Sequence, residues 1–221
     1  MIDLHTHTLL SDGELLPSEL ARRAESKGYK VIAFTDHVDF SNVENVISSL
    51  VRVSEKLNRN LRIKTIPGVE ITHVNPIDIP VIVQIAKNMG AKLIIVHGET
   101  IVEPVAKGTN RKAIESEIDI LAHPGILSEE DAKIAAEKGI YVEISARKGH
   151  SLSNGHIVRL WYEYGFPLIL NTDAHSPEDL IDDEFARKII ISSGVKVADV
   201  NTVIQNSYIL AKSKLDIGFE I

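Results

Sequence analysis

The sequence has no cysteine among its 221 residues, few aromatic residues, no excess of positive charge and no long apolar run. Without thiols the chain can form neither a disulfide nor a thiolate metal site. A net charge of −7 with 5% aromatics argues against a surface for long nucleic acids, which needs basic stripes or stacking rings. The first residues suit a strand better than a signal peptide, and no stretch could span a bilayer. We therefore expect a cytoplasmic protein with no membrane partner and no stable nucleic-acid partner.

Short apolar runs alternate with stretches of helical periodicity along most of the chain. The runs predict seven buried strands, around Leu4 and at residues 31–35, 63–69, 92–96, 118–122, 140–144 and 167–172. Helical spacing predicts helices at 17–27, 45–58, 76–89, 128–138 and 155–164, then two more at 183–193 and 197–212. The weaker stretch 102–116 can carry a short helix. The tail to residue 221 shows no clear pattern. This alternation predicts one domain over residues 1–221, with parallel strands in either a closed barrel or an open sheet.

Metal-capable side chains follow six of the seven predicted strands. They are His5, His7, His37, Glu70, His97, His123, Asp173 and His175. Alternate residues of a strand share one face, so His5 and His7 can share an ion. The carboxyl ends of parallel strands converge at the mouth of a closed barrel, whereas the first and last strands of an open sheet lie apart. The pattern therefore favours a barrel with one metal cluster, which must use imidazole and carboxylate ligands suited to zinc, manganese or iron.

Asp12 lies in the turn Ser11-Asp12-Gly13, soon after the first predicted strand. From its position the side chain could reach the same mouth. An aspartate beside a glycine is equally typical of an ordinary turn. The spacing alone leaves both interpretations open.

Seven separated motifs make the sequence resemble the polymerase and histidinol phosphatase (PHP) family. They span residues 2–175 and read His5-Thr6-His7-Thr8, Ser11-Asp12-Gly13, Thr35-Asp36-His37, Pro67-Gly68-Val69-Glu70, Val96-His97-Gly98, Ala122-His123-Pro124 and Thr172-Asp173-Ala174-His175. The resemblance implies a distorted seven-stranded (β/α)7 TIM-like barrel that holds up to three divalent ions.

Motif by motif, the resemblance divides the ligands among three ions. His5, His7, Glu70 and Asp173 would hold the first, and Glu70 would bridge to a second held by His97 and His123. Asp12, His37 and His175 would hold the third. Many family members have histidine at the position of Asp12, so this departure puts the third ion in most doubt.

The function implied is metal-dependent hydrolysis of a small phosphate monoester, as in the histidinol phosphatases. A hydroxide that bridges two ions would attack the phosphorus directly, without a serine or cysteine nucleophile. Glu70, His123 and Asp173 would be catalytic, because loss of any one should abolish metal-dependent turnover.

Substrate contacts are expected from the loop after the sixth predicted strand. Arg147 could grip phosphate oxygens, and Lys148 or His150 could add charge or donate a proton to the leaving group. His73, just beyond Glu70, could also touch substrate. Each of these residues could instead be an ordinary solvated loop residue.

Three other functions compete with this interpretation. A phosphodiesterase or nucleotidase for small nucleotides uses the same chemistry. A non-catalytic barrel subunit, as in archaeal ribonuclease P, should have lost metal ligands that this chain keeps. Amidohydrolases also begin with two alternate histidines, but usually need a lysine where this chain has His97. The sequence is compatible with a homo-oligomer and cannot name the phosphorylated substrate.

Overall fold

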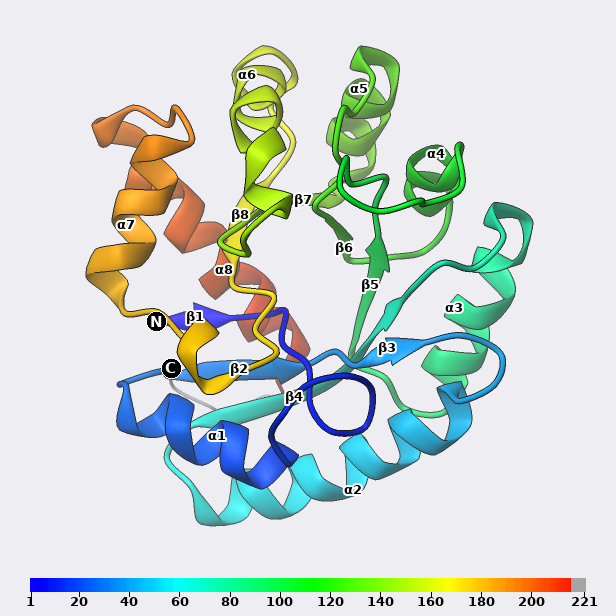
Figure 1. Cartoon of the computed structure of the whole chain (residues 1–221), viewed down its shortest axis with the longest axis vertical. Helices are drawn as coiled ribbons and strands as arrows, with labels where there is room; N and C mark the ends of the chain where they lie inside the picture. The colour runs from blue at the N-terminus through cyan, green and yellow to red at the C-terminus, as the bar shows by residue number, and fades with distance from the viewer. Residues whose placement is uncertain (216–221) are drawn as a thin grey trace.

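The computed structural model describes residues 1–215 and shows parallel strands enclosed by helices (Figure 1). The strands are β1 (Ile2–Asp3), β2 (Val31–Phe34), β3 (His37–Val38), β4 (Lys64–Ile71), β5 (Leu93–His97), β6 (Ile120–Ala122), β7 (Tyr141–Ser145) and β8 (Leu168–Asn171). The α-helices are α1 (Pro17–Ser26), α2 (Val43–Asn60), α3 (Ile79–Asn88), α4 (Thr109–Glu115), α5 (Glu129–Lys138), α6 (Asn154–Tyr164), α7 (Asp183–Ser192) and α8 (Val200–Lys214). Each of the seven predicted strands is present, at least in part.

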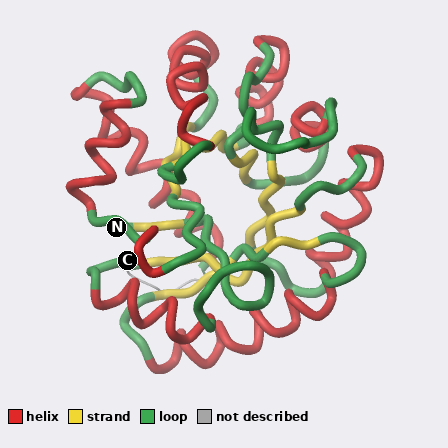
Figure 2. Tube along the Cα trace, in the orientation of Figure 1, coloured by secondary structure: helices red, strands yellow, loops and turns green. Residues whose placement is uncertain are grey.

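Hydrogen bonding links the strands in the order β1-β2-β4-β5-β6-β7-β8, and β3 pairs with the far end of β4. The ring closes just beyond β1 and β8, where Thr6 forms a parallel bridge with Ala174. The N–H of His7 donates to the carbonyl of Ala174 over 2.8 Å, and that of Asp173 donates to the carbonyl of His5 over 3.0 Å. Figure 2 shows the strands as a ring inside the helices. The predicted distorted TIM-like barrel is confirmed.

The strands are buried on both faces, as expected for a parallel sheet covered by helices. In β2, Val31 and Ala33 belong to an inner apolar cluster and Ile32 and Phe34 to the outer one, which packs against the helices. Helix α8 adds Leu210 and Ala211 to the inner cluster, so it covers the amino-terminal end of the barrel. Polar chemistry is therefore left to the carboxyl end.

Local sequence signals explain where several helices begin. Pro17 occupies the first turn of α1, where its missing N–H costs nothing. The Ser128 hydroxyl accepts a hydrogen bond from the N–H of Asp131 and caps α5, as predicted. The short helix expected within the weaker stretch 102–116 is α4, which begins at Thr109, and residues 99–108 before it form a loop. None of the helices within residues 1–215 has the length and apolar character needed to cross a membrane.

Candidate metal centre

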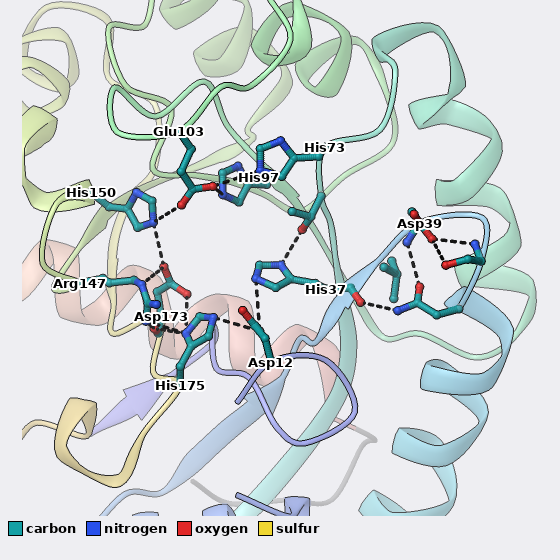
Figure 3. A pocket seen from close by; sticks show the side chains of 14 residues that line it. Asp12, His37, Asp39, His73, His97, Glu103, Arg147, His150, Asp173 and His175 are labelled. Carbon is teal, nitrogen blue, oxygen red and sulfur yellow. Dashed lines mark hydrogen bonds and ion pairs between the residues drawn. The ribbon is translucent and has the colours of Figure 1, made fainter. Parts of the chain in front are cut away.

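The nine residues predicted as metal ligands all lie at the carboxyl end of the barrel, although the chain separates them by up to 170 positions. Their side chains meet in one cluster, and Figure 3 shows several of them around a cavity. Imidazole and carboxylate atoms in this cluster form groups whose members lie within 4.8 Å of one another.

The residues predicted for the first ion form the buried floor of the cluster. His5 Nε2 lies 3.3 Å from Glu70 Oε1, and His7 Nε2 lies 3.1 Å from Asp173 Oδ1. His123 Nε2 lies 3.4 Å from the same Glu70 oxygen and 3.7 Å from Asp173 Oδ2. Glu70 and Asp173 therefore stand between histidines from opposite sides of the barrel, as ligands shared between ions would.

The residues predicted for the third ion lie nearer to solvent. Asp12 Oδ1 is 3.2 Å from His175 Nε2 and 3.6 Å from His37 Nε2, and it is 4.0 Å from His7 Nδ1. Gly13 permits this arrangement, since a Cβ there would lie 2.4 Å from the carbonyl oxygen of His7. The loop can fold back so tightly only without a side chain, and Asp12 thereby comes to face the histidines.

The residues predicted for the second ion meet a carboxylate that the sequence did not single out. His97 Nε2 lies 3.2 Å from Glu103 Oε2, while the His97 and His123 rings meet edge to face at 4.4 Å. His150 stacks on His123 with ring centroids 4.1 Å apart. Its Nε2 lies 3.4 Å from Glu103 Oε1 and 3.6 Å from Asp173 Oδ2.

Unpaired polar atoms test whether a divalent ion fits this cluster. Among residues 1–215, buried side-chain nitrogens and oxygens without a hydrogen-bond partner occur at His5, His7, Glu70, His123, Glu143 and Asp173, and at Ser54 elsewhere. Such atoms cost about 1–3 kcal/mol each when nothing satisfies them. Four ligands placed tetrahedrally at about 2.0–2.1 Å around zinc lie about 3.3 Å apart, which matches the 3.1–3.4 Å contacts above. The donor set therefore fits divalent ions.

Three non-glycine residues with positive φ also belong to this region. They are His73 at 53°, His123 at 26° and Asp173 at 53°. Side chains disfavour this backbone region, so each such residue costs about 1–3 kcal/mol and persists only where its surroundings hold it there. Two of the three are predicted ligands at strand ends, so strained backbone turns their side chains into the mouth.

The electrostatics of the cluster keep its carboxylates charged. Burial alone would raise the pKa of Glu70, but His5 and His37 hold that pKa well below its usual range. Asp173 behaves in the same way, because His5 and His7 outweigh its burial and lower its pKa. Burial together with the nearby His37 lowers the pKa of His7 to about 3, so this imidazole stays neutral and free to bind a cation.

Supporting hydrogen bonds fix the orientation of the predicted ligands. Glu143 Oε2 lies 2.8 Å from His5 Nδ1 and also accepts from the Asn171 amide over 2.8 Å. The Nδ1 atom of His97 lies 3.1 Å from the carbonyl of Gly98. In both histidines Nε2 is left to face the cluster, which is how neighbouring groups usually orient metal-binding imidazoles.

The four residues predicted to contact substrate differ in position. Arg147, His73 and His150 line a cavity of about 380 Å³ above the cluster, whereas Lys148 is exposed and lies outside that lining. Arg147 Nη1 donates to the carbonyl of Asp173 over 3.0 Å and lies 2.7 Å from His175 Nδ1. His73 Nε2 lies 3.1 Å from Glu103 Oε2.

Glu103 is a cavity residue that the sequence analysis did not single out. It belongs to none of the seven motifs and lies in the weaker stretch 102–116. The available signal was weak: a carboxylate a few residues after a strand-end histidine, in a segment of poor helical periodicity.

Comparisons with known proteins agree with this architecture. The PHP domain family matches residues 3–97. Protein MJ1295 of Methanocaldococcus jannaschii is 47% identical over 195 residues, which cover 87% of this chain and 89% of that protein. The Probable phosphatase Teth514_1060 of a Thermoanaerobacter species is 28% identical, over 88% of this chain and 87% of its own.

Two solved structures share the fold at low sequence identity. A chain in archaeal ribonuclease P with mature tRNA gives a TM-score of 0.74 at 14% identity, covering 100% of this chain and 97% of that chain. Histidinol phosphate phosphatase of Lactococcus lactis, complexed with Zn, L-histidinol and phosphate, gives 0.61 at 17% identity, covering 88% and 94%. The ligand motifs, the barrel that gathers them and the relatives agree: the chain belongs to the PHP family.

Proposed function

We propose that this protein is a metal-dependent phosphoesterase that hydrolyses a small phosphate monoester. The observation that carries the proposal is the set of buried imidazole and carboxylate atoms without hydrogen-bond partners that converge on one mouth. The names of the relatives support the same class, since one is a probable phosphatase and one structural neighbour is a histidinol phosphate phosphatase.

In this proposal His5, His7, Glu70 and Asp173 hold one divalent ion. His97 and His123 hold a second with Glu70, and Asp12, His37 and His175 hold a third. Zinc, manganese or iron would each suit these ligands. When bound, such ions supply an activated water near neutral pH and neutralise charge that builds on a phosphoryl group.

The residues of the chain then have distinct tasks. Glu70 and Asp173 fix the spacing between ions, because each carboxylate contacts histidines from several strands. Arg147 binds phosphate oxygens, since its guanidinium lines the cavity and its Nη1 is held by the Asp173 carbonyl. The substrate body would occupy the rest of the same cavity.

The size of the cavity favours a small substrate over a polymer. About 380 Å³ lies within the usual range for small-molecule pockets. The net charge of −7 also disfavours a long polyanion. A nucleotide monoester fits these constraints as well as a smaller metabolite does, so the choice between them is left to the experiment.

A screen of the metal-loaded protein tests the proposal. We expect phosphate release from at least one phosphomonoester among histidinol phosphate, sugar phosphates and nucleotides, and little from a dinucleotide. Release should stop with chelator and in Glu70→Gln. The proposal fails if the protein holds no metal, releases no phosphate and instead binds RNA.

A further inference from the structure

Glu103 places a carboxylate between three histidines that come from different loops. Its Oε2 lies 3.2 Å from His97 Nε2 and 3.1 Å from His73 Nε2, and its Oε1 lies 3.4 Å from His150 Nε2. Figure 3 shows Glu103 above the cavity, flanked by His150 on one side and by His97 and His73 on the other. All three contacts use Nε2, the nitrogen left for a ligand when Nδ1 is otherwise engaged.

The spacing of these atoms matches ligands around one ion. One ring nitrogen each of His73 and His97 and one Glu103 oxygen lie within 4.8 Å of one another. Neighbouring ligands around tetrahedral zinc lie about 3.3 Å apart, close to the 3.1 and 3.2 Å seen here. His97 already faces this point, because its Nδ1 contacts the carbonyl of Gly98.

The backbone around this point is also specialised. His73 has a positive φ of 53°, a backbone conformation that residues other than glycine adopt only at a cost in free energy. Glu103 precedes Pro104, and a residue before proline is restricted to extended conformations. Both features reduce the freedom of the two side chains before any ion binds.

Hydrogen bonds join the two ends of the 99–108 loop, which carries Glu103. Glu99 Oε1 accepts from the N–H groups of Gly108 and Asn110, and the Asn110 side chain accepts from the N–H of Glu99. The tip meets the barrel mouth through Glu103, whose side chain keeps 36% of its surface exposed. A ligand at the tip would therefore tie the loop to the metal centre.

We propose that Glu103 is a further protein ligand of the ion held by His97, delivered by the 99–108 loop and joined by His73. The inference rests on the proposed metal-dependent function and adds to it a coupling between metal binding and the position of the loop. The loop would cover the second ion when the site is loaded and be released when the ion is removed.

The test compares Glu103→Gln with Asp39→Asn in the full chain. Asp39 lines the same cavity and its side chain contacts Ser41 rather than a histidine, so its variant controls for loss of one negative charge at the mouth. Metal content is measured after dialysis against a fixed low concentration of zinc, and cobalt substitution reports the coordination of the bound ions. Hydrogen exchange of the 99–108 segment is followed with zinc and with chelator.

We expect Glu103→Gln to lose about one ion per chain, or to bind it at least about tenfold more weakly, since even outer-shell partners of metal ligands cost 10–100-fold in affinity. Its cobalt spectrum should change, and zinc should no longer protect the loop from exchange. Asp39→Asn should match the wild type in all three measurements. If Glu103→Gln does not fold, the same measurements are made on His73→Gln, because His73, just after β4, is proposed to bind the same ion.

Three results would overturn the inference. Unchanged metal content, spectrum and loop protection in Glu103→Gln would show that Glu103 is no ligand, while leaving the phosphoesterase proposal intact. Equal losses of metal in Glu103→Gln and Asp39→Asn would show that the loss follows from removing one negative charge at the mouth and not from removing a ligand. A wild-type protein that binds no metal would remove both proposals together.

Discussion

Substituting Glu143 by glutamine tests whether a buried carboxylate controls the metal centre through His5. Glu143 is fully buried, and one of its oxygens contacts both His5 Nδ1 and the Asn171 amide at 2.8 Å. Glutamine keeps the shape but loses the charge, and it leaves an amide N–H₂ in a buried position. Removing such a partner typically lowers metal affinity 10–100-fold, which is about 1.4–2.8 kcal/mol.

Thermal unfolding with zinc and with chelator measures this loss. The stabilisation that zinc gives to the folded protein should fall by the same 1.4–2.8 kcal/mol or so, because it follows the ratio of free ion to dissociation constant. Glu117→Gln serves as a control, since Glu117 pairs with Lys87 on the surface. A Glu143→Gln variant that binds zinc within twofold of wild type would refute the reasoning and leave Glu143 as a packing residue.

Three further outcomes are expected. Gly13→Ala should lower the free energy of unfolding by about 1–3 kcal/mol in a denaturant titration, because its Cβ would lie 2.4 Å from the carbonyl oxygen of His7. The variant should also fail to bind the third ion. A variant as stable as wild type would contradict this. Arg147→Ala should raise KM for a phosphate ester about tenfold or more with metal content unchanged. Arg147→Lys should not restore the wild-type KM, since lysine lacks the planar guanidinium that binds a phosphate with two parallel hydrogen bonds. An unchanged KM would remove Arg147 from the phosphate site. Burial opposes charge on His5, but neighbouring carboxylates raise its pKa well above 6.5, so metal binding at pH 7 should release a proton. Calorimetric heats that do not vary between buffers of different ionisation enthalpy would count against it. Without metal, the same raised pKa stabilises the fold fully below pH 6.5, and this contribution is lost as pH rises through the folded value.

Local patterns in the sequence were enough to predict the strands and the metal-capable residues that gather at the barrel mouth. Strands buried on both faces have a short apolar signature, and metal-capable residues at their ends are visible in one dimension. If His5 and Asp173 share an ion, they must lie close together, so the first and last strands were expected to be neighbours. The bridge between Thr6 and Ala174 confirms that closure.

The sequence could not predict the features that depend on contacts between distant segments. Glu143 lies 138 positions from His5, and no local pattern shows which histidine its carboxylate contacts. The 99–108 loop is held closed by hydrogen bonds between Glu99 and Asn110, and no local pattern in the sequence reveals that contact.

The sequence by itself therefore determined the family, the barrel and the chemical type of the centre, since each follows from residue type and spacing along the chain. The tertiary structure decided which side chains gather above that centre. It brought Glu103 to His73 and His97, set Asp12 opposite His175 and left Lys148 in solvent. These placements depend on how loops fold over a closed barrel, and that is settled by long-range packing, not by local preference.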